Sequence, residues 1–199
     1  MKKTAIHFLF LLVLAAGFAG CKKDYGNKLG PLQDSVAAIP VTVTNQVYFE
    51  RFPIVTTTVG ADGNGTFSIA FSIPADKGKI KEITKVATGN SGVEYLQSSL
   101  YPNYLTTAVA GTGTNTITFS SDLNAVRSYV TRLNAAFPTL PAGSTKTAAF
   151  AFTGTSTGGA GTLTPNTNPQ TPNQLRFFFL ITLEDGTQLI TTEVDVRLL

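Results

Sequence analysis

The chain has 199 residues, 43% of them apolar, and a formal net charge of +3 at pH 7. This length suits one domain or two small ones, and the apolar content is sufficient for a core stabilised by burial. There is one cysteine, one histidine and no tryptophan, so an intrachain disulfide is excluded.

The first twenty-one residues have the pattern of an export signal. Lys2 and Lys3 precede an apolar run over residues 5–18, and small residues then lead to Cys21. The run is shorter than the roughly 20 residues that a membrane-spanning helix needs. The segment resembles the type II signal of bacterial lipoproteins; an ordinary signal peptide is the alternative. The resemblance implies removal of residues 1–20, a lipid on Cys21 that binds the membrane, and a place in the cell envelope, at the outer membrane or cell surface.

Removing this signal changes the chemistry that remains. It takes away Lys2, Lys3 and His7, so that thirteen basic residues face twelve acidic ones and the formal charge falls to +1. Histidine-based catalytic triads, Cys-His pairs and zinc sites built from these residues are then excluded. The weak charge gives no basis for nucleic-acid binding. We expect no bound metal and no cofactor.

Residues 21–39 are expected to form a flexible tether, because they contain few large apolar side chains to offset the cost of ordering them. Lys22-Lys23-Asp24 resembles part of the export tag that follows the lipidated cysteine of Bacteroidetes surface lipoproteins. Asp34-Ser35-Val36 is similar to the O-glycosylation acceptor of that phylum, which implies a sugar on Ser35. A plain polar linker is the alternative.

The first strands of the folded part are predicted by apolar residues that alternate with polar ones. Residues 41–49 and 66–73 have this period of two, and a β-branched run over 54–59 lies between them. In the first segment, Val47 and Phe49 share the parity expected to face the core. Asp62-Gly63-Asn64-Gly65 predicts a hairpin turn, with part of a calcium loop as the alternative.

Four lysines surround the next apolar segment, residues 80–86, in which apolar residues lie three apart. This spacing indicates a β-bulge or a short helical turn. The lysines favour a solvated sheet edge that resists pairing with other chains; an anionic glycan or lipid headgroup is the alternative. They are Lys77, Lys79, Lys81 and Lys85.

Tyr95, Tyr101 and Tyr104 are the first candidate binding residues. They lie close to the loop residues Pro102-Asn103, and amphipathic rings of this kind suit a flat platform for sugars. Packing in the rim and core is the alternative.

One helix is predicted, over about residues 121–137. Ser120-Ser121-Asp122 offers a hydroxyl cap and an early acid, the apolar residues that follow are spaced by three and four, and prolines end the pattern. A strand over 146–153 and a long loop over 154–174 follow. The loop is either a binding loop or a mobile excursion.

The end of the chain predicts a hairpin. Residues 175–183 are apolar on both faces, as in a central strand, and Asp185-Gly186 is a preferred turn pair. In the returning segment 188–199, Ile190, Val194, Val196 and Leu198 share one parity. We therefore expect a mainly β fold, with a single domain over 40–199.

This hairpin carries a resemblance. The residues are Leu183-Glu184-Asp185-Gly186-Thr187 and Val194-Asp195-Val196-Arg197, together with Cys21 and the tether. They are similar to a poorly characterised group of Bacteroidetes lipoproteins with immunoglobulin-like domains. The resemblance implies an antiparallel immunoglobulin-like β-sandwich, and related surface lipoproteins bind oligosaccharides through aromatic platforms.

A non-catalytic surface module that binds a glycan or an envelope protein is the function expected from these features. A structural or adhesive envelope lipoprotein is the alternative. A carboxylate-based glycoside hydrolase is the third hypothesis, since two acids suffice for that reaction. However, nothing in the sequence fixes two of the acids at a useful separation, and Glu193 is expected on an exposed face. The acids considered are Glu50, Glu82, Glu94, Glu184, Asp185 and Glu193.

Overall fold

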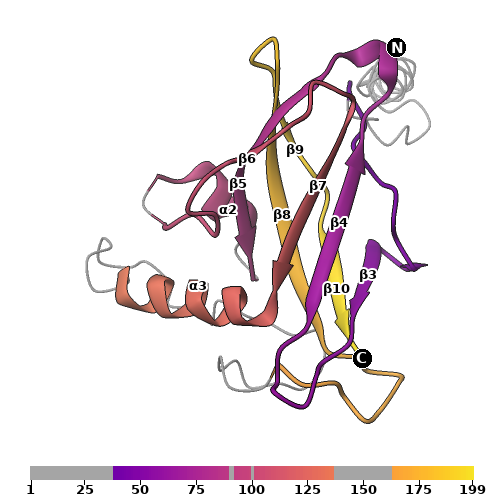
Figure 1. Ribbon diagram of the computed structural model, residues 1–199, viewed down its shortest axis with the longest axis vertical. Helices are drawn as coiled ribbons and strands as arrows, with labels where there is room; N and C mark the ends of the chain where they lie inside the picture. The colour runs from indigo at the N-terminus through magenta and orange to yellow at the C-terminus, as the bar shows by residue number, and fades with distance from the viewer. Residues whose placement is uncertain (1–37, 90–91, 100, 137–162) are drawn as a thin grey trace, which may run out of the picture. The chain divides into compact units, whose positions relative to one another are not determined.

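The computed structural model describes residues 38–89, 92–99, 101–136 and 163–199 (Figure 1). The chain divides into two units, residues 1–37 and 38–199, and every described residue belongs to the second. Cys21, Ser35, the strand expected over 146–153 and the first part of the long loop lie outside the described residues.

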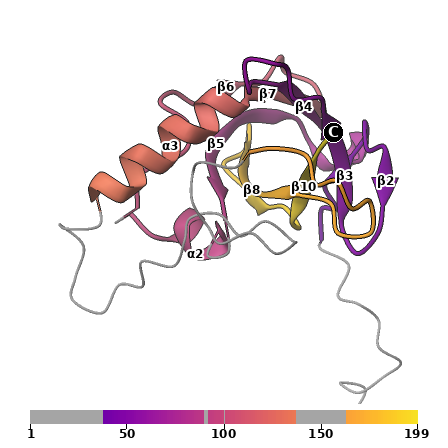
Figure 2. The ribbon, with the colours of Figure 1, turned by 90° about the horizontal axis from the view of Figure 1, so that it is seen from below.

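The described residues form a mainly β fold with two sheets and a sandwich-like arrangement, as the sequence predicts. Seen from below, β4 and β7 lie on one side and β8 and β10 on the other (Figure 2). The small sheet has the order β1-β4-β7, with β1 (Thr42–Val43), β4 (Thr66–Ser72) and β7 (Thr116–Asp122). The large sheet has the order β2-β3-β10-β8-β5-β6, and β9 also pairs with β8. Its strands are β2 (Tyr48–Phe49), β3 (Pro53–Thr57), β5 (Ile80–Thr88), β6 (Val109–Ala110), β8 (Gln174–Leu183), β9 (Gln188–Ile190) and β10 (Val194–Leu198).

The pairing is mostly antiparallel, with one exception. β3 and β10 run parallel, from Ile54 beside Asp195 to Thr57 beside Leu198. The expectation of a wholly antiparallel sandwich is therefore wrong at this pair. A period of two reports which faces are buried and is the same for either strand direction, so the sequence pattern does not reveal the parallel pair.

The core lies between the two sheets and consists mostly of valine, isoleucine and leucine, with a cluster of phenylalanine rings in contact with one another. Phe71 of β4 meets Phe179 of β8 edge to face at 4.7 Å between ring centroids, and Phe67 lies 5.4 Å from Phe177. Alternation over 66–73 is confirmed, because the apolar residues of β4 are buried. Full burial of such a side chain stabilises the fold by roughly 1.5–3 kcal/mol.

The unusual spacing in β5 is explained by two irregularities in its pairing with β8. The register shifts between Ile80 and Glu82 and again between Ile83 and Lys85. Each shift adds a residue to β5, so Ile80, Ile83 and Val86 all reach the core although they lie three apart. The predicted bulge is confirmed.

β5 is not the free edge that its lysines suggested. It pairs with β8 along its length and with β6 at Glu82 and Ile83. Beyond β6, the Asn103 side chain takes the place of a strand, since its Nδ2 donates to the Thr84 carbonyl at 3.1 Å and its Oδ1 accepts from the Val86 amide at 3.0 Å.

Helix α3 (Leu123–Ala136) confirms the predicted helix, with a different cap. β7 continues to Asp122, and the carboxylate of Asp122, not a serine hydroxyl, accepts from the Ala125 amide at 2.9 Å. The side chain of Asn64 accepts from the next amide, that of Asn124, at 3.1 Å. These bonds satisfy amides that a helix start leaves without intrahelical partners.

A second helix, α2 (Gly92–Gln97), was not predicted. It has only six residues, too few to show a helical period, and tertiary contacts hold it. Nζ of Lys85 donates to the carbonyls of Leu96 and Ser98 at 3.3 and 3.1 Å, at its C-terminal end. A Cβ atom at Gly92 would lie 2.1 Å from the Phe178 ring, so this close packing needs glycine.

The returning segment of the C-terminal hairpin is broken between β9 and β10. Thr191 pairs with Phe179 through its amide and its hydroxyl, at 3.0 and 3.2 Å. Val194 and Val196 are buried as predicted, but Ile190 is exposed, because the break shifts the parity of β9. The prediction that Ile190 shares the parity of Val194 and Val196 is therefore wrong.

Candidate functional site

Tyr104 is a core residue. Only 6% of its surface is exposed, and its ring lies within 6 Å of the rings of Phe119, Tyr129 and Phe177. Its hydroxyl is 2.6 Å from Oγ of Ser121. Burial raises the pKa of Tyr104 to about 12, although the Ser121 hydrogen bond opposes that shift.

The other two tyrosines form a pair beside α2. The rings of Tyr95 and Tyr101 are 4.2 Å apart at an interplanar angle of 31°. Tyr95 is buried, whereas Tyr101 is partly exposed and its hydroxyl donates to Oε1 of Glu94 at 3.3 Å. Since Tyr95 and Tyr104 are both buried, the three rings do not form a shared exposed platform, and the packing alternative describes them better.

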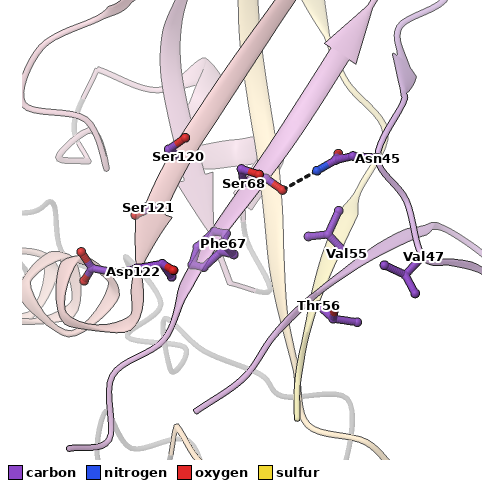
Figure 3. A pocket seen from close by; sticks show the side chains of 10 residues that line it. Asn45, Val47, Val55, Thr56, Phe67, Ser68, Ser120, Ser121 and Asp122 are labelled. Carbon is purple, nitrogen blue, oxygen red and sulfur yellow. Dashed lines mark hydrogen bonds between the residues drawn. The ribbon is translucent and has the colours of Figure 1, made fainter. Parts of the chain in front are cut away.

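An open groove of about 610 Å³ lies instead beside β4 and β7 (Figure 3). We call it the hydroxyl groove, because serine and threonine provide half of the residues that line it. The lining residues are Asn45, Val47, Val55, Thr56, Thr66, Phe67, Ser68, Ser120, Ser121 and Asp122.

Strand alternation explains why hydroxyl groups reach this surface. Phe67 and Phe119 point into the core, so Ser68 and Ser120 point outward, and both are exposed. The two serines are paired across β4 and β7. One serine from each strand is therefore held side by side on a rigid sheet.

Along the edge of β4 that borders the groove, side chains form the hydrogen bonds that a further strand would otherwise make. The Asn45 side chain donates to the Ser68 carbonyl at 2.8 Å and accepts from the Ala70 amide at 2.9 Å; Figure 3 shows the first of these bonds. The Thr57 hydroxyl donates to the Thr66 carbonyl at 2.9 Å. The strand edge is thereby blunted while the space beside it stays open.

Asp122 is the one charged residue among those lining the hydroxyl groove. Its carboxylate already caps α3 by accepting from Ala125. Hydroxyl groups both donate and accept hydrogen bonds, and no second titratable side chain lines the groove. The arrangement suits recognition of a neutral polar ligand and offers no pair of groups for acid-base catalysis.

A second groove of about 440 Å³ continues from the same strand. It shares Ser120 and Ser121 with the hydroxyl groove, and it extends to Arg132 of α3. Arg132 donates to the Tyr104 carbonyl at 2.7 Å. The two openings together provide a mixed polar and apolar surface beside the end of β7.

The exposed aromatic residues lie on β2, where the sequence did not predict them. Val47, Tyr48 and Phe49 are exposed, Phe49 to 69%. The predicted burial of Val47 and Phe49 is wrong, because β2 leaves the sheet of β1 and pairs only with β3, at the outer edge of the large sheet. In the sequence, Gln46 and Glu50 flank Val47-Tyr48-Phe49. This local pattern does not indicate that the chain moves from one sheet to the other.

The candidate acids are only partly brought together. Glu50 and Glu193 both line a separate groove, with Asp195. Glu193 was expected on an exposed face, but its side chain is largely buried and pairs with Nε of Arg176 at 3.1 Å. Among the described residues, no group of three or more histidine, cysteine or acidic side chains is placed to hold a metal ion.

No helix in the described ranges is long and apolar enough to span a membrane. Comparisons with models of known families, with curated proteins and with solved structures find no match for the chain.

Proposed function

We propose that the chain is a lipid-anchored, non-catalytic surface protein whose β-sandwich binds a neutral oligosaccharide in the hydroxyl groove. The observation that carries this proposal is the open groove itself, lined by hydroxyl and amide groups beside two rigid strands.

The chemistry of the groove supports a sugar ligand. Sugar hydroxyls both donate and accept, as do those of the exposed Ser68 and Ser120. Val47 and Val55 add apolar surface for the C–H faces of a sugar ring. An anionic ligand would find no basic partner among the residues that line the hydroxyl groove.

The shape of the surface supports a chain of several sugars. The hydroxyl groove and the neighbouring groove share Ser120 and Ser121, so one ligand can contact both. A longer ligand makes more hydrogen bonds, each with a modest net effect, and this compensates for the absence of tryptophan.

The finer fold assignment, an immunoglobulin-like sandwich, is part of the proposal. If β1, β4 and β7 are strands A, B and E, and β5, β8 and β10 are strands C, F and G, the small sheet and the central part of the large sheet follow the immunoglobulin strand order. β2, β3, β6 and β9 lie outside this scheme. A strand D is missing from this scheme among the described strands, and α3 follows strand E.

The anchoring part of the proposal is supported by the signal that ends at Cys21. More than one acyl chain on this residue makes anchoring stable, whereas one alone is marginal. We expect wild-type protein to stay with the membrane after a carbonate wash and Cys21→Ser to be released as a folded, soluble domain. Retention of the variant by the membrane would contradict the lipid anchor.

The binding part is tested by screening the purified full chain against neutral oligosaccharides. Ser120→Arg places a long side chain in the groove and should weaken binding at least about tenfold, the loss of one or two hydrogen bonds. Thr116→Arg is the matched control, because Thr116 is exposed on the same face of β7 but does not line the groove. Absence of any ligand, or equal loss in both variants, would argue against the site.

A second candidate function, adhesion to an envelope protein, is favoured by β2. Its exposed side chains form an apolar patch of the kind found at protein interfaces. Phe49→Asp should then remove partners captured by crosslinking in intact cells without reducing oligosaccharide binding. Unchanged crosslinking would exclude β2 as the contact.

A further inference from the structure

A third groove, of about 400 Å³, lies on the outer face of the large sheet. Strands β8 and β10 form its floor, and the segments 50–52 and 170–172 form its sides. We call it the charged groove. Its lining residues are Glu50, Arg51, Phe52, Gln170, Thr171, Pro172, Gln174, Arg176, Glu193 and Asp195.

Asp195 is the unusual residue of this groove. It lies between Val194 and Val196, which point into the core, so its side chain points to the opposite face. Only 6% of its surface is exposed, and its Oδ1 has no hydrogen-bond partner within the part of the chain that the structure describes. A buried acceptor without a donor is costly, and here it borders an open space that a donor can enter.

Two of the neighbouring guanidinium groups are already paired with other acids. Arg176 lies across from Asp195 in the sheet, but its Nε pairs with Glu193 at 3.1 Å. Arg197 pairs with Glu50 at 2.5 Å. Of the three acids that line the groove, Glu193 and Glu50 form these ion pairs, and Asp195 forms no ion pair with a described residue.

The surroundings of Asp195 disfavour its charged form. Burial and then the charge of Glu193 raise its pKa to about 7; Arg176 opposes the shift, and a hydrogen bond to Glu193 and the charge of Glu50 add to it. The carboxyl group therefore titrates near neutral pH and not near pH 4. A cation placed beside it would replace its proton.

The sides of the groove suit a ligand with an apolar chain that ends in a positive charge. Phe52 and Pro172 line it. The guanidinium of Arg51 already lies 5.2 Å from the centre of the Phe52 ring, so this ring holds a cation in the structure itself.

We propose that the charged groove binds a protonated primary amine, the group at the end of a lysine side chain on a protein partner. The ammonium would donate to Oδ1 of Asp195, with Glu193 and Glu50 nearby, and its methylene stem would lie against Phe52. A compact ammonium with three donors fits such a site better than a planar guanidinium, which needs a wider fork of acceptors. The charged groove shares no lining residue with the hydroxyl groove.

The test is calorimetric titration of the purified full chain with Nα-acetyl-lysine methylamide at pH 8. The neutral control ligand is Nα-acetyl-norleucine methylamide, which has a similar stem without the ammonium. We expect binding of the lysine compound only, and binding at least about tenfold weaker at pH 5.5, where the proton occupies Asp195. Equal binding of both compounds, no binding of either, or no dependence on pH would overturn the proposal.

Asp195→Asn removes the charge and keeps the shape, so it should weaken lysine binding at least about tenfold. Asp76→Asn is the matched control, since Asp76 is exposed and lies outside the groove. Should Asp195→Asn fail to fold, Glu50→Gln gives a second arm, with an expected loss of about threefold because its charge acts from the side of the groove. An unchanged affinity in a folded variant would refute the site.

Discussion

The three tyrosines and the hydroxyl groove use their side chains in opposite ways. Tyr95 and Tyr104 place large rings in the interior, where they fill space between the sheets and α3. Ser68 and Ser120 have small side chains on the outer face of β4 and β7, so they leave open space at the surface there. The contrast teaches that aromatic residues near loops do not by themselves locate a binding surface.

The largest effect expected from this contrast is on stability. Tyr104→Ala should lower the free energy of unfolding by about 3–5 kcal/mol, because it leaves a cavity among three aromatic rings. Tyr101→Ala should cost less than half as much, since Tyr101 is partly exposed. Urea unfolding of both variants measures the difference. Similar losses of stability would show that Tyr104 is no more important for the core than Tyr101.

The next effect concerns the charged groove and depends on pH. The pKa of Asp195 is raised to about 7 in the folded state from an ordinary value of 3.8. Folding therefore binds a proton between these values, and the contribution of Asp195 to stability falls as pH rises from about 4 to 7. Relative to wild type, Asp195→Asn should therefore gain about 4 kcal/mol in the free energy of unfolding between pH 4 and pH 8.

This gain is measured by urea unfolding of wild type and Asp195→Asn at both pH values. Taking the difference between the two proteins cancels other titrating groups, such as Asp185, whose pKa is lowered by hydrogen bonds from Thr187. If the difference in the free energy of unfolding between the two proteins did not change with pH, the pKa of Asp195 would not be raised by its surroundings.

A smaller effect is expected at the start of α3. Asp122→Ala removes the carboxylate that accepts from Ala125 and should cost about 1 kcal/mol of stability. Asp76→Ala, at an exposed position, should change stability by less than about 0.5 kcal/mol. If Asp122→Ala were as stable as the wild type, the Asp122 carboxylate would not be the cap of α3.

Local patterns were sufficient to predict several elements. β4 and β8 were found from alternation and from a continuous apolar run, and α3 from its spacing, because these signals lie within one segment. The bulges in β5 were visible as an irregular spacing. Helix α2 is not visible in the sequence pattern, because contacts with Lys85 and Phe178 hold it in place. Both residues lie outside the helix in the sequence.

The candidate site was less accessible to prediction for the same reason. The groove depends on Asn45 reaching Ser68 and on β4 lying beside β7, which are contacts between distant parts of the chain. Burial of Asp195 likewise requires β10 to pair with both β3 and β8. Alternation places Asp195 opposite to Val194 and Val196, but it does not show what covers that face.

The most direct test compares the two regions in one binding experiment. The full chain, Ser120→Arg and Tyr101→Ala are titrated with the same neutral oligosaccharide, chosen from the wild-type screen. We predict that Ser120→Arg loses at least about tenfold in affinity, whereas Tyr101→Ala binds as the wild type does. The reverse result, with binding lost in Tyr101→Ala and kept in Ser120→Arg, would contradict the hydroxyl groove and return the site to the tyrosines.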